Sequence, residues 1–254
     1  MNEQRLNEPA PAPSVDLLTG RIGEATDRLL ATADGLSDLQ VRERSRLPGW
    51  TRGHVLTHIA RNADGLRNLL IWAKTGLRTP QYPSRQVRDA QIEDGATRTA
   101  AELTADIADS AKEFLAQAAD LDAEAWQTEV TGLRGPAHPA WFVLSRRNFE
   151  VEVHHADLAA DYGTEDWPEW FVAEQLYRVT GNLDSDPATP AAVLTDTDAG
   201  RQYILRPDLL GPGTTERAIS GPGHVLLAWL LGRDDGARLM ADPSGPLPQI
   251  PAYG

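Results

Sequence analysis

The sequence predicts an α+β protein in which a four-helix bundle precedes a smaller α/β domain. Four long stretches in the first part of the chain carry apolar residues at helical spacing. After Trp167-Pro168 the pattern changes to short strand-like runs separated by Pro and Gly. We therefore expect a disordered lead-in at residues 1–12, a bundle at residues 13–165 and the α/β domain at residues 166–254.

The first two long helices have clear signals at their ends. The first is predicted at residues 14–35, where apolar residues recur at helical spacing. The second is predicted to run from Thr51, whose hydroxyl is suited to cap a helix N-terminus, to Thr75. Gly76 follows as a natural stop, because glycine readily adopts the conformation that ends a helix.

The same periodicity predicts the second half of the bundle. A short helix is expected at residues 85–93, a long helix at residues 99–121 and a fourth long helix at residues 139–163. Residues 128–139 contain Gly and Pro and are expected to form a short hairpin or an irregular loop. Four amphipathic helices of this length are typical of a bundle.

The second domain is predicted to mix short strands with two helices. Its apolar runs are short and are bounded by turn-forming residues, which favours strands over long helices. The helices are expected near residues 169–180 and 223–231, and the strands at residues 191–195, 202–206, 217–220 and 237–241.

The composition excludes several functional classes. The chain has no cysteine, so it can form no disulfide and offers no thiol nucleophile or thiolate metal ligand, and any thiol chemistry must use an external thiol. The formal net charge of −13 argues against a nucleic-acid partner. A small anionic substrate remains compatible with this charge, because a local arginine cluster can reverse the field in a cleft.

The sequence also gives expectations about where the protein is located and whether it has partners. No run of eighteen apolar residues occurs, so no membrane span is expected. The polar N-terminus lacks the apolar region of a secretion signal, which predicts a cytoplasmic protein. No protein partner is evident from the sequence.

Two histidines and one carboxylate form a candidate metal site. Glu150 and His154 are four residues apart in the fourth helix, so they share one helix face. His58 lies in the second helix, about ninety residues earlier. Two His and a carboxylate with an open fourth position are typical of catalytic zinc, although iron or nickel also fits such ligands.

Spacing alone leaves alternatives open. A Glu and a His four residues apart on a helix are more often a solvated pair than metal ligands. In the second helix either His54 or His58 could point inward. On the bare sequence, Arg88 and Arg233 are most simply surface residues.

Residues 47–63, LPGWTRGHVLTHIARNA, resemble the signature of the mycothiol-dependent maleylpyruvate isomerase family. That family belongs to the DinB-like helical-bundle metalloproteins. The similarity continues through residues 68–84 and 146–158, and so covers most of the first domain. It reaches the second domain more thinly, around Gly232-Arg233.

The resemblance implies which residues form the site. The family's metal ligands match His58, Glu150 and His154, whereas His54 does not match a ligand. The implied cofactors are a divalent metal, with zinc favoured, and mycothiol. Residues that contact mycothiol are not identified by the sequence.

The resemblance also implies a reaction. Mycothiol would add as thiolate to the double bond of maleylpyruvate, and rotation followed by loss of the thiol would give fumarylpyruvate, a step of the gentisate pathway of aromatic catabolism. The two arginines that the family uses for activity match Arg88 and Arg233, which would anchor the substrate carboxylates.

Two other functions stay open at this point. The chain could be a mycothiol S-transferase with the same bundle, whose product would retain the thiol. It could also be a non-catalytic metal- or ligand-binding module, which predicts a closed site with His54 as a fourth ligand.

Overall fold

The computed structural model describes residues 14–133, 135–210 and 217–251. The chain divides into two compact units, Pro13–Gly163 and Thr164–Gly254. The predicted α+β class is confirmed, because the first unit is helical and the second combines helices with a sheet. The predicted lead-in at residues 1–12 lies outside the described residues. Within the described ranges, no helix has the length and apolar character needed to cross a membrane.

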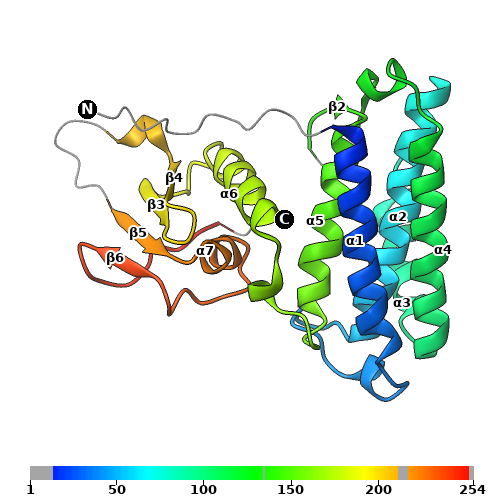
Figure 1. Cartoon of the computed structure of the whole chain (residues 1–254), viewed down its shortest axis with the longest axis horizontal. Helices are drawn as coiled ribbons and strands as arrows, with labels where there is room; N and C mark the ends of the chain where they lie inside the picture. The colour runs from blue at the N-terminus through cyan, green and yellow to red at the C-terminus, as the bar shows by residue number, and fades with distance from the viewer. Residues whose placement is uncertain (1–13, 134, 211–216, 252–254) are drawn as a thin grey trace. The chain divides into compact units, whose positions relative to one another are not determined.

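The first unit is built from four long helices that lie side by side (Figure 1). A shorter helix lies in the connection between the second and third of these helices and packs on the second. The long helices are α1 (Val15–Asp34), α2 (Arg52–Thr75), α4 (Ala100–Ala119) and α5 (Phe142–Asp157), and the short one is α3 (Arg85–Gly95). Two 3-10 turns complete the unit, η1 (Gln40–Arg42) and η2 (Ala125–Gln127).

Several helices begin or end at the capping residues that the sequence predicts. The hydroxyl of Thr51 accepts a hydrogen bond from the backbone N–H of His54, and Thr99 caps α4 in the same way. Gly76 ends α2 with a φ of 70°, a left-handed conformation that glycine adopts without steric strain. Local chemistry therefore fixes these boundaries.

Residues 128–139 contain a small hairpin, one of the two conformations expected there. Its strands are β1 (Glu129–Val130) and β2 (His138–Pro139), which pair antiparallel. Because Pro139 belongs to β2, the following helix begins at Phe142 and not at residue 139 as predicted.

The predicted end of the fourth helix at Gly163 is wrong, because α5 ends at Asp157. Ala159 adopts a positive φ of 53°, which stops the helix. The guanidinium of Arg52 donates to the carbonyl oxygens of Leu158 and Ala159, each at 2.7 Å. A side chain from α2 thus satisfies carbonyls that a longer helix would have bonded internally.

Ion pairs show that α2 and α4 run parallel, since residue numbers rise together along both helices. The pairs are Arg61–Asp106, Arg67–Glu113 and Lys74–Asp120. Parallel neighbours need a long connection between them, and α3 lies within it. This topology brings α3 back to the beginning of α2.

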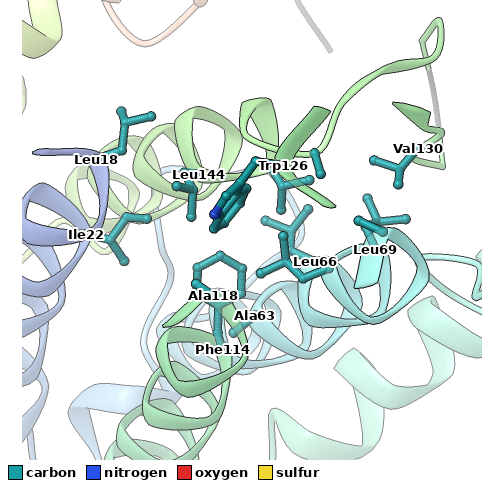
Figure 2. Close-up of a cluster of buried hydrophobic side chains, with 14 residues drawn as sticks. Leu18, Ile22, Ala63, Leu66, Leu69, Phe114, Ala118, Trp126, Val130 and Leu144 are labelled. Carbon is teal, nitrogen blue, oxygen red and sulfur yellow. The ribbon is translucent and has the colours of Figure 1, made fainter. Parts of the chain in front are cut away.

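Two clusters of buried apolar side chains fill the bundle. Leu66, Phe114 and Leu144 belong to the cluster drawn in Figure 2, and all three are inaccessible to solvent. Leu29 and Ile59 belong to the other. Such packing holds the polar side chains carried by α2 and α5 in fixed positions.

The second unit contains a four-stranded sheet in the order β4-β3-β5-β6, in which only β3 and β5 pair in parallel. Helices α6 and α7 pack against each other and against strands of this sheet. The strands are β3 (Ala192–Asp196), β4 (Arg201–Leu205), β5 (Ala218–Gly221) and β6 (Met240–Asp242). The helices are α6 (Glu169–Leu183) and α7 (Gly223–Leu230), with 3-10 turns η3 (Thr164–Asp166) and η4 (Pro207–Leu209).

Candidate metal centre

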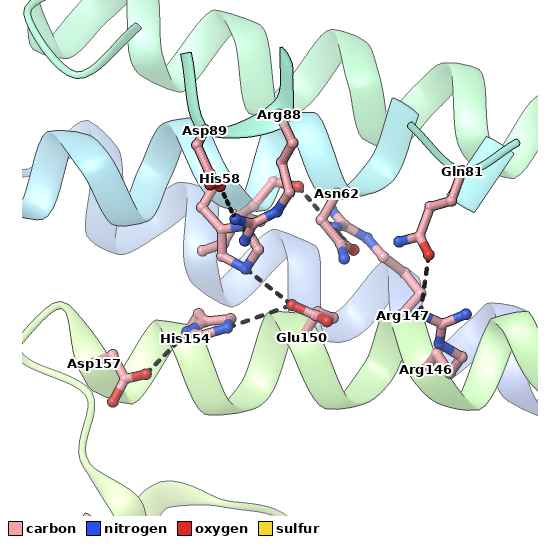
Figure 3. A network of polar contacts seen from close by, with 11 residues as sticks. His58, Asn62, Gln81, Arg88, Asp89, Arg146, Arg147, Glu150, His154 and Asp157 are labelled. Atoms are coloured by element: carbon pink, nitrogen blue, oxygen red, sulfur yellow. Dashed lines mark hydrogen bonds and ion pairs between the residues drawn. The ribbon is translucent and has the colours of Figure 1, made fainter. Parts of the chain in front are cut away.

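His58, Glu150 and His154 converge between α2 and α5 (Figure 3). One potential ligand atom from each lies within 4.8 Å of the other two. Oε2 of Glu150 is 3.0 Å from Nε2 of His58 and 3.3 Å from Nε2 of His154. The structure therefore brings together the three residues that the family resemblance singles out.

The three groups have strongly shifted proton affinities. Burial, with the nearby charge of His154, lowers the pKa of His58 to about 4. Burial also disfavours charge on His154, but hydrogen bonds to Asp157 and Glu150 outweigh it and raise the pKa of His154 to about 9. Burial opposes the charge of Glu150 as well, yet hydrogen bonds from both histidines hold its pKa well below its usual value. At neutral pH this site therefore presents an anionic carboxylate, one neutral imidazole and one imidazolium.

Asp157 contacts the imidazole of His154 at Nδ1, the nitrogen that does not face Glu150. Its Oδ2 lies 2.9 Å from Nδ1 of His154, and its side chain is inaccessible to solvent. A carboxylate at Nδ1 keeps a proton there and orients the ring so that Nε2 faces Glu150. When Nε2 loses its own proton, its lone pair becomes available to a cation at this point. Sequence reasoning missed this role, although the spacing of three residues after a candidate ligand could have indicated it.

Arg88 lies against the outer edge of His58. Its Nη2 is 3.1 Å from Nδ1 of His58, and its Nη1 is 2.7 Å from Oδ1 of Asp89. Its guanidinium carbon stands 5.9 Å from the centre of the Tyr82 ring. The residue predicted to bind a substrate carboxylate thus lies beside a candidate metal ligand.

Close packing of two glycines positions the helix that carries Arg88. A Cβ atom at Gly53 would collide with the backbone of Ala96, and one at Gly95 would collide with the buried side chain of Thr57. These contacts let α3 approach the first turns of α2 closely. Arg88 can reach His58 because of that approach.

Trp50 also borders the site. Its ring meets the imidazole of His58 edge-on, with 5.5 Å between ring centroids. From its position at a helix end, Trp50 is most simply interpreted as a packing residue. Its place next to a candidate ligand depends on the turn before α2, which spacing does not reveal.

The other candidate residues of the two helices lie elsewhere. His54 has Nδ1 2.7 Å from Oγ1 of Thr51 and Nε2 3.3 Å from Oε2 of Glu93. It is absent from the group of converging ligands found in the described part of the chain. His155 faces α1, with Nε2 2.8 Å from Oγ1 of Thr32. A closed site completed by His54 therefore has no support.

Arg233 lies in the second unit, just after α7. Its backbone N–H donates to the carbonyl of Ala228 at 2.8 Å, and its Nη1 donates to the carbonyl of Leu231 at 2.7 Å. Its proposed part in substrate binding stays a prediction.

The residues fit a divalent cation. Two imidazole nitrogens and one carboxylate oxygen form a donor set that suits zinc. The buried carboxylate of Asp157 fixes one of the two imidazoles, an arrangement common behind metal-binding histidines. Oε2 of Glu150 lies close to Nε2 of both His58 and His154 and supplies negative charge between them.

Comparisons with known proteins identify the family of the chain. The family model of the mycothiol maleylpyruvate isomerase N-terminal domain matches residues 22–159. A crystal structure of the mycothiol-dependent maleylpyruvate isomerase is similar at a TM-score of 0.86 and 26% identity, over 95% of this chain and 98% of that chain. A histidine-to-alanine mutant of such an isomerase gives a TM-score of 0.85 with the same identity and coverage. Among curated proteins, no sequence matches the chain.

Proposed function

Because this chain belongs to the mycothiol maleylpyruvate isomerase family, we propose that it is a zinc- and mycothiol-dependent enzyme that converts maleylpyruvate to fumarylpyruvate. Family membership and similarity over 95% of the chain support a mycothiol-dependent isomerase. Zinc and this substrate pair are the finer part of the proposal. The convergence of His58, Glu150 and His154 is the observation that carries it.

In this proposal His58, Glu150 and His154 would hold the cation. When bound, the cation favours the thiolate of mycothiol, whose reversible addition to the substrate's conjugated double bond would allow rotation about that bond. The absence of cysteine is consistent with a thiol that comes from outside the chain.

In this scheme, residues of the chain orient a metal ligand and bind the substrate carboxylates. Asp157 holds the imidazole of His154 with Nε2 directed at the centre. Arg88, whose Nη2 lies 3.1 Å from Nδ1 of His58, would bind a substrate carboxylate and offset the negative charge of an enolate. On the family resemblance alone, we propose that Arg233 adds a further positive charge for the substrate carboxylates.

The test compares turnover with and without mycothiol and with and without zinc. Maleylpyruvate is incubated with the enzyme, and the ratio of cis to trans isomers is followed. We expect isomerisation only when both mycothiol and zinc are present. Full activity of the chelated enzyme would contradict the metal requirement.

Two matched variants assign the ligand on α2. His58→Gln should lose zinc affinity and activity together. His54→Gln, one turn earlier, should retain both, since glutamine can still accept from the N–H of Thr51 in the capping box. A product that retains the thiol would indicate an S-transferase instead.

A further inference from the structure

Arg146 carries a positive charge next to the metal centre, and within the described ranges it has no carboxylate partner. Arg146, Glu150 and His154 follow at steps of four residues, so they share one face of α5. Nη2 of Arg146 donates to Oε1 of Gln81 at 3.1 Å, and Nη1 lies 3.4 Å from Nε2 of His138. Neither partner is negatively charged. In the ranges that the structure describes, no carboxylate forms an ion pair with Arg146.

The neighbouring Arg147 adds a second positive charge. It is inaccessible to solvent and donates through Nη1 to the carbonyl of Ile59 at 2.8 Å and to Oδ1 of Asn62 at 3.0 Å. Its Nε and Nη2 have no hydrogen-bond partner among the residues that the structure describes. The carboxylate of Glu150 attracts both arginines, but a bound cation would take up that charge. This part of the centre would then favour an anion.

The guanidinium of Arg146 is held in place by the loop that follows β1. A Cβ atom on Gly132 would collide with it, so the glycine lets the loop backbone lie directly against the side chain. The N–H of Leu133 donates to Oε1 of Gln81 at 2.9 Å, the same oxygen that accepts from Arg146. A fixed guanidinium is suited to bind a carboxylate through two parallel hydrogen bonds.

In Figure 3, Arg88 lies above His58, whereas Arg146 lies farther along α5, on the side of Glu150 away from His154. Arg146 is four residues before Glu150 on α5, about 6 Å along the helix axis. Arg88 reaches His58 from α3. Two consecutive residues contact the two arginines: Gln81 accepts from Arg146, and the ring of Tyr82 lies under Arg88.

We propose that Arg146 forms a second anion subsite, which binds one carboxylate of a short dicarboxylate whose other carboxylate is bound at Arg88. The proposal deepens the proposed function and rests on it for the identity of the substrate. It makes Arg146 a specificity-determining residue for dianionic ligands.

The test measures binding without turnover. Maleate, a short cis dicarboxylate, is titrated calorimetrically into the zinc-loaded full-length protein, and crotonate serves as the corresponding monoanion. We expect Arg146→Met to weaken maleate binding by about ten- to a hundredfold and crotonate binding much less. Arg146→Lys should recover part of the affinity, because lysine keeps the charge and loses the paired geometry.

Arg67→Met is the control, since Arg67 pairs with Glu113 on the surface of the bundle. It should bind maleate as the wild type does. Wild-type affinity for maleate in Arg146→Met, equal losses for maleate and crotonate, or no maleate binding by the wild type would each overturn the subsite. If Arg146→Met does not fold, the weaker maleate binding expected of Arg146→Lys provides the same test.

The experiment separates the two proposals. If the protein lacks isomerase activity but its maleate binding depends on Arg146, the subsite proposal is supported and the proposed reaction is contradicted. In an active enzyme, Arg146→Met should raise KM for maleylpyruvate with a smaller change in kcat. An unchanged KM would count against the subsite while leaving the isomerase intact.

Discussion

Removal of Asp157 should weaken zinc binding although Asp157 is not itself a candidate ligand. Its Oδ2 lies 2.9 Å from Nδ1 of His154, and its side chain has no exposure to solvent. A hydrogen bond to a charged group contributes about 1.5–3 kcal/mol, which corresponds to about ten- to a hundredfold in affinity. Residues that support metal-bound histidines have effects of about the same size. We therefore expect Asp157→Ala to weaken zinc binding by up to about a hundredfold.

Asp157→Asn should have a smaller effect, about tenfold, because its amide oxygen can still accept from Nδ1 of His154. The assay is competition for zinc against a chromophoric chelator at pH 7, with circular dichroism to confirm folding. Asp161→Asn is the matched control, since Asp161 is exposed and lies just beyond the same helix. Wild-type zinc affinity in Asp157→Ala would refute the reasoning.

Three further outcomes are expected. Because the pKa of His154 is about 9 and that of His58 about 4, a cation must displace one proton from His154 near neutral pH. Zinc affinity should therefore rise about tenfold per pH unit from pH 6 to 8 and level off near pH 9; a flat profile in competition titrations would contradict the assignment. Phe114→Ala should lower the free energy of unfolding in urea by about 3–5 kcal/mol, because Phe114 is inaccessible to solvent, and a loss below about 1 kcal/mol would be inconsistent with its packing. Gly95→Ala should destabilise by about 1–3 kcal/mol through its clash with Thr57, whereas Gly20→Ala, with open space around it, should not; equal unfolding midpoints for the two variants would argue against close packing of α3.

Much of the bundle could be predicted because its signals are local. Ser14 and Thr51 cap α1 and α2 through their own hydroxyls, and Gly76 ends α2 by its backbone freedom. Each signal lies within a few residues of the boundary that it sets. The change of pattern after Trp167 likewise predicted a second unit that contains a sheet.

The end of α5 could not be predicted in this way. Its periodicity continues toward Gly163, yet the helix stops at Asp157 because Arg52 from α2 satisfies the carbonyls of Leu158 and Ala159. A cap supplied from about a hundred residues away leaves no local mark in the sequence. The same holds for Gly53, whose need for close approach becomes visible only against α3.

The candidate site likewise has features that the sequence predicts and features that only the tertiary structure reveals. Spacing alone placed Glu150 and His154 on one helix face, and the family signature preferred His58 to His54. Only the tertiary structure placed the three ligand atoms within 4.8 Å of one another, with His54 directed to Glu93. Helical spacing defines a face, whereas the packing of α2 on α5 decides which faces meet.

Which residues support the candidate ligands depends entirely on the packing of the helices and loops. Three features depend on what lies opposite a side chain. Asp157 lies behind His154, Trp50 lies at the edge of His58, and Arg146 has no carboxylate partner in the part of the chain that the structure describes. The sequence by itself determined the helices, their caps and the lack of an internal thiol. The tertiary structure decided which charges are buried and paired, because burial and pairing depend on contacts between segments far apart in the chain.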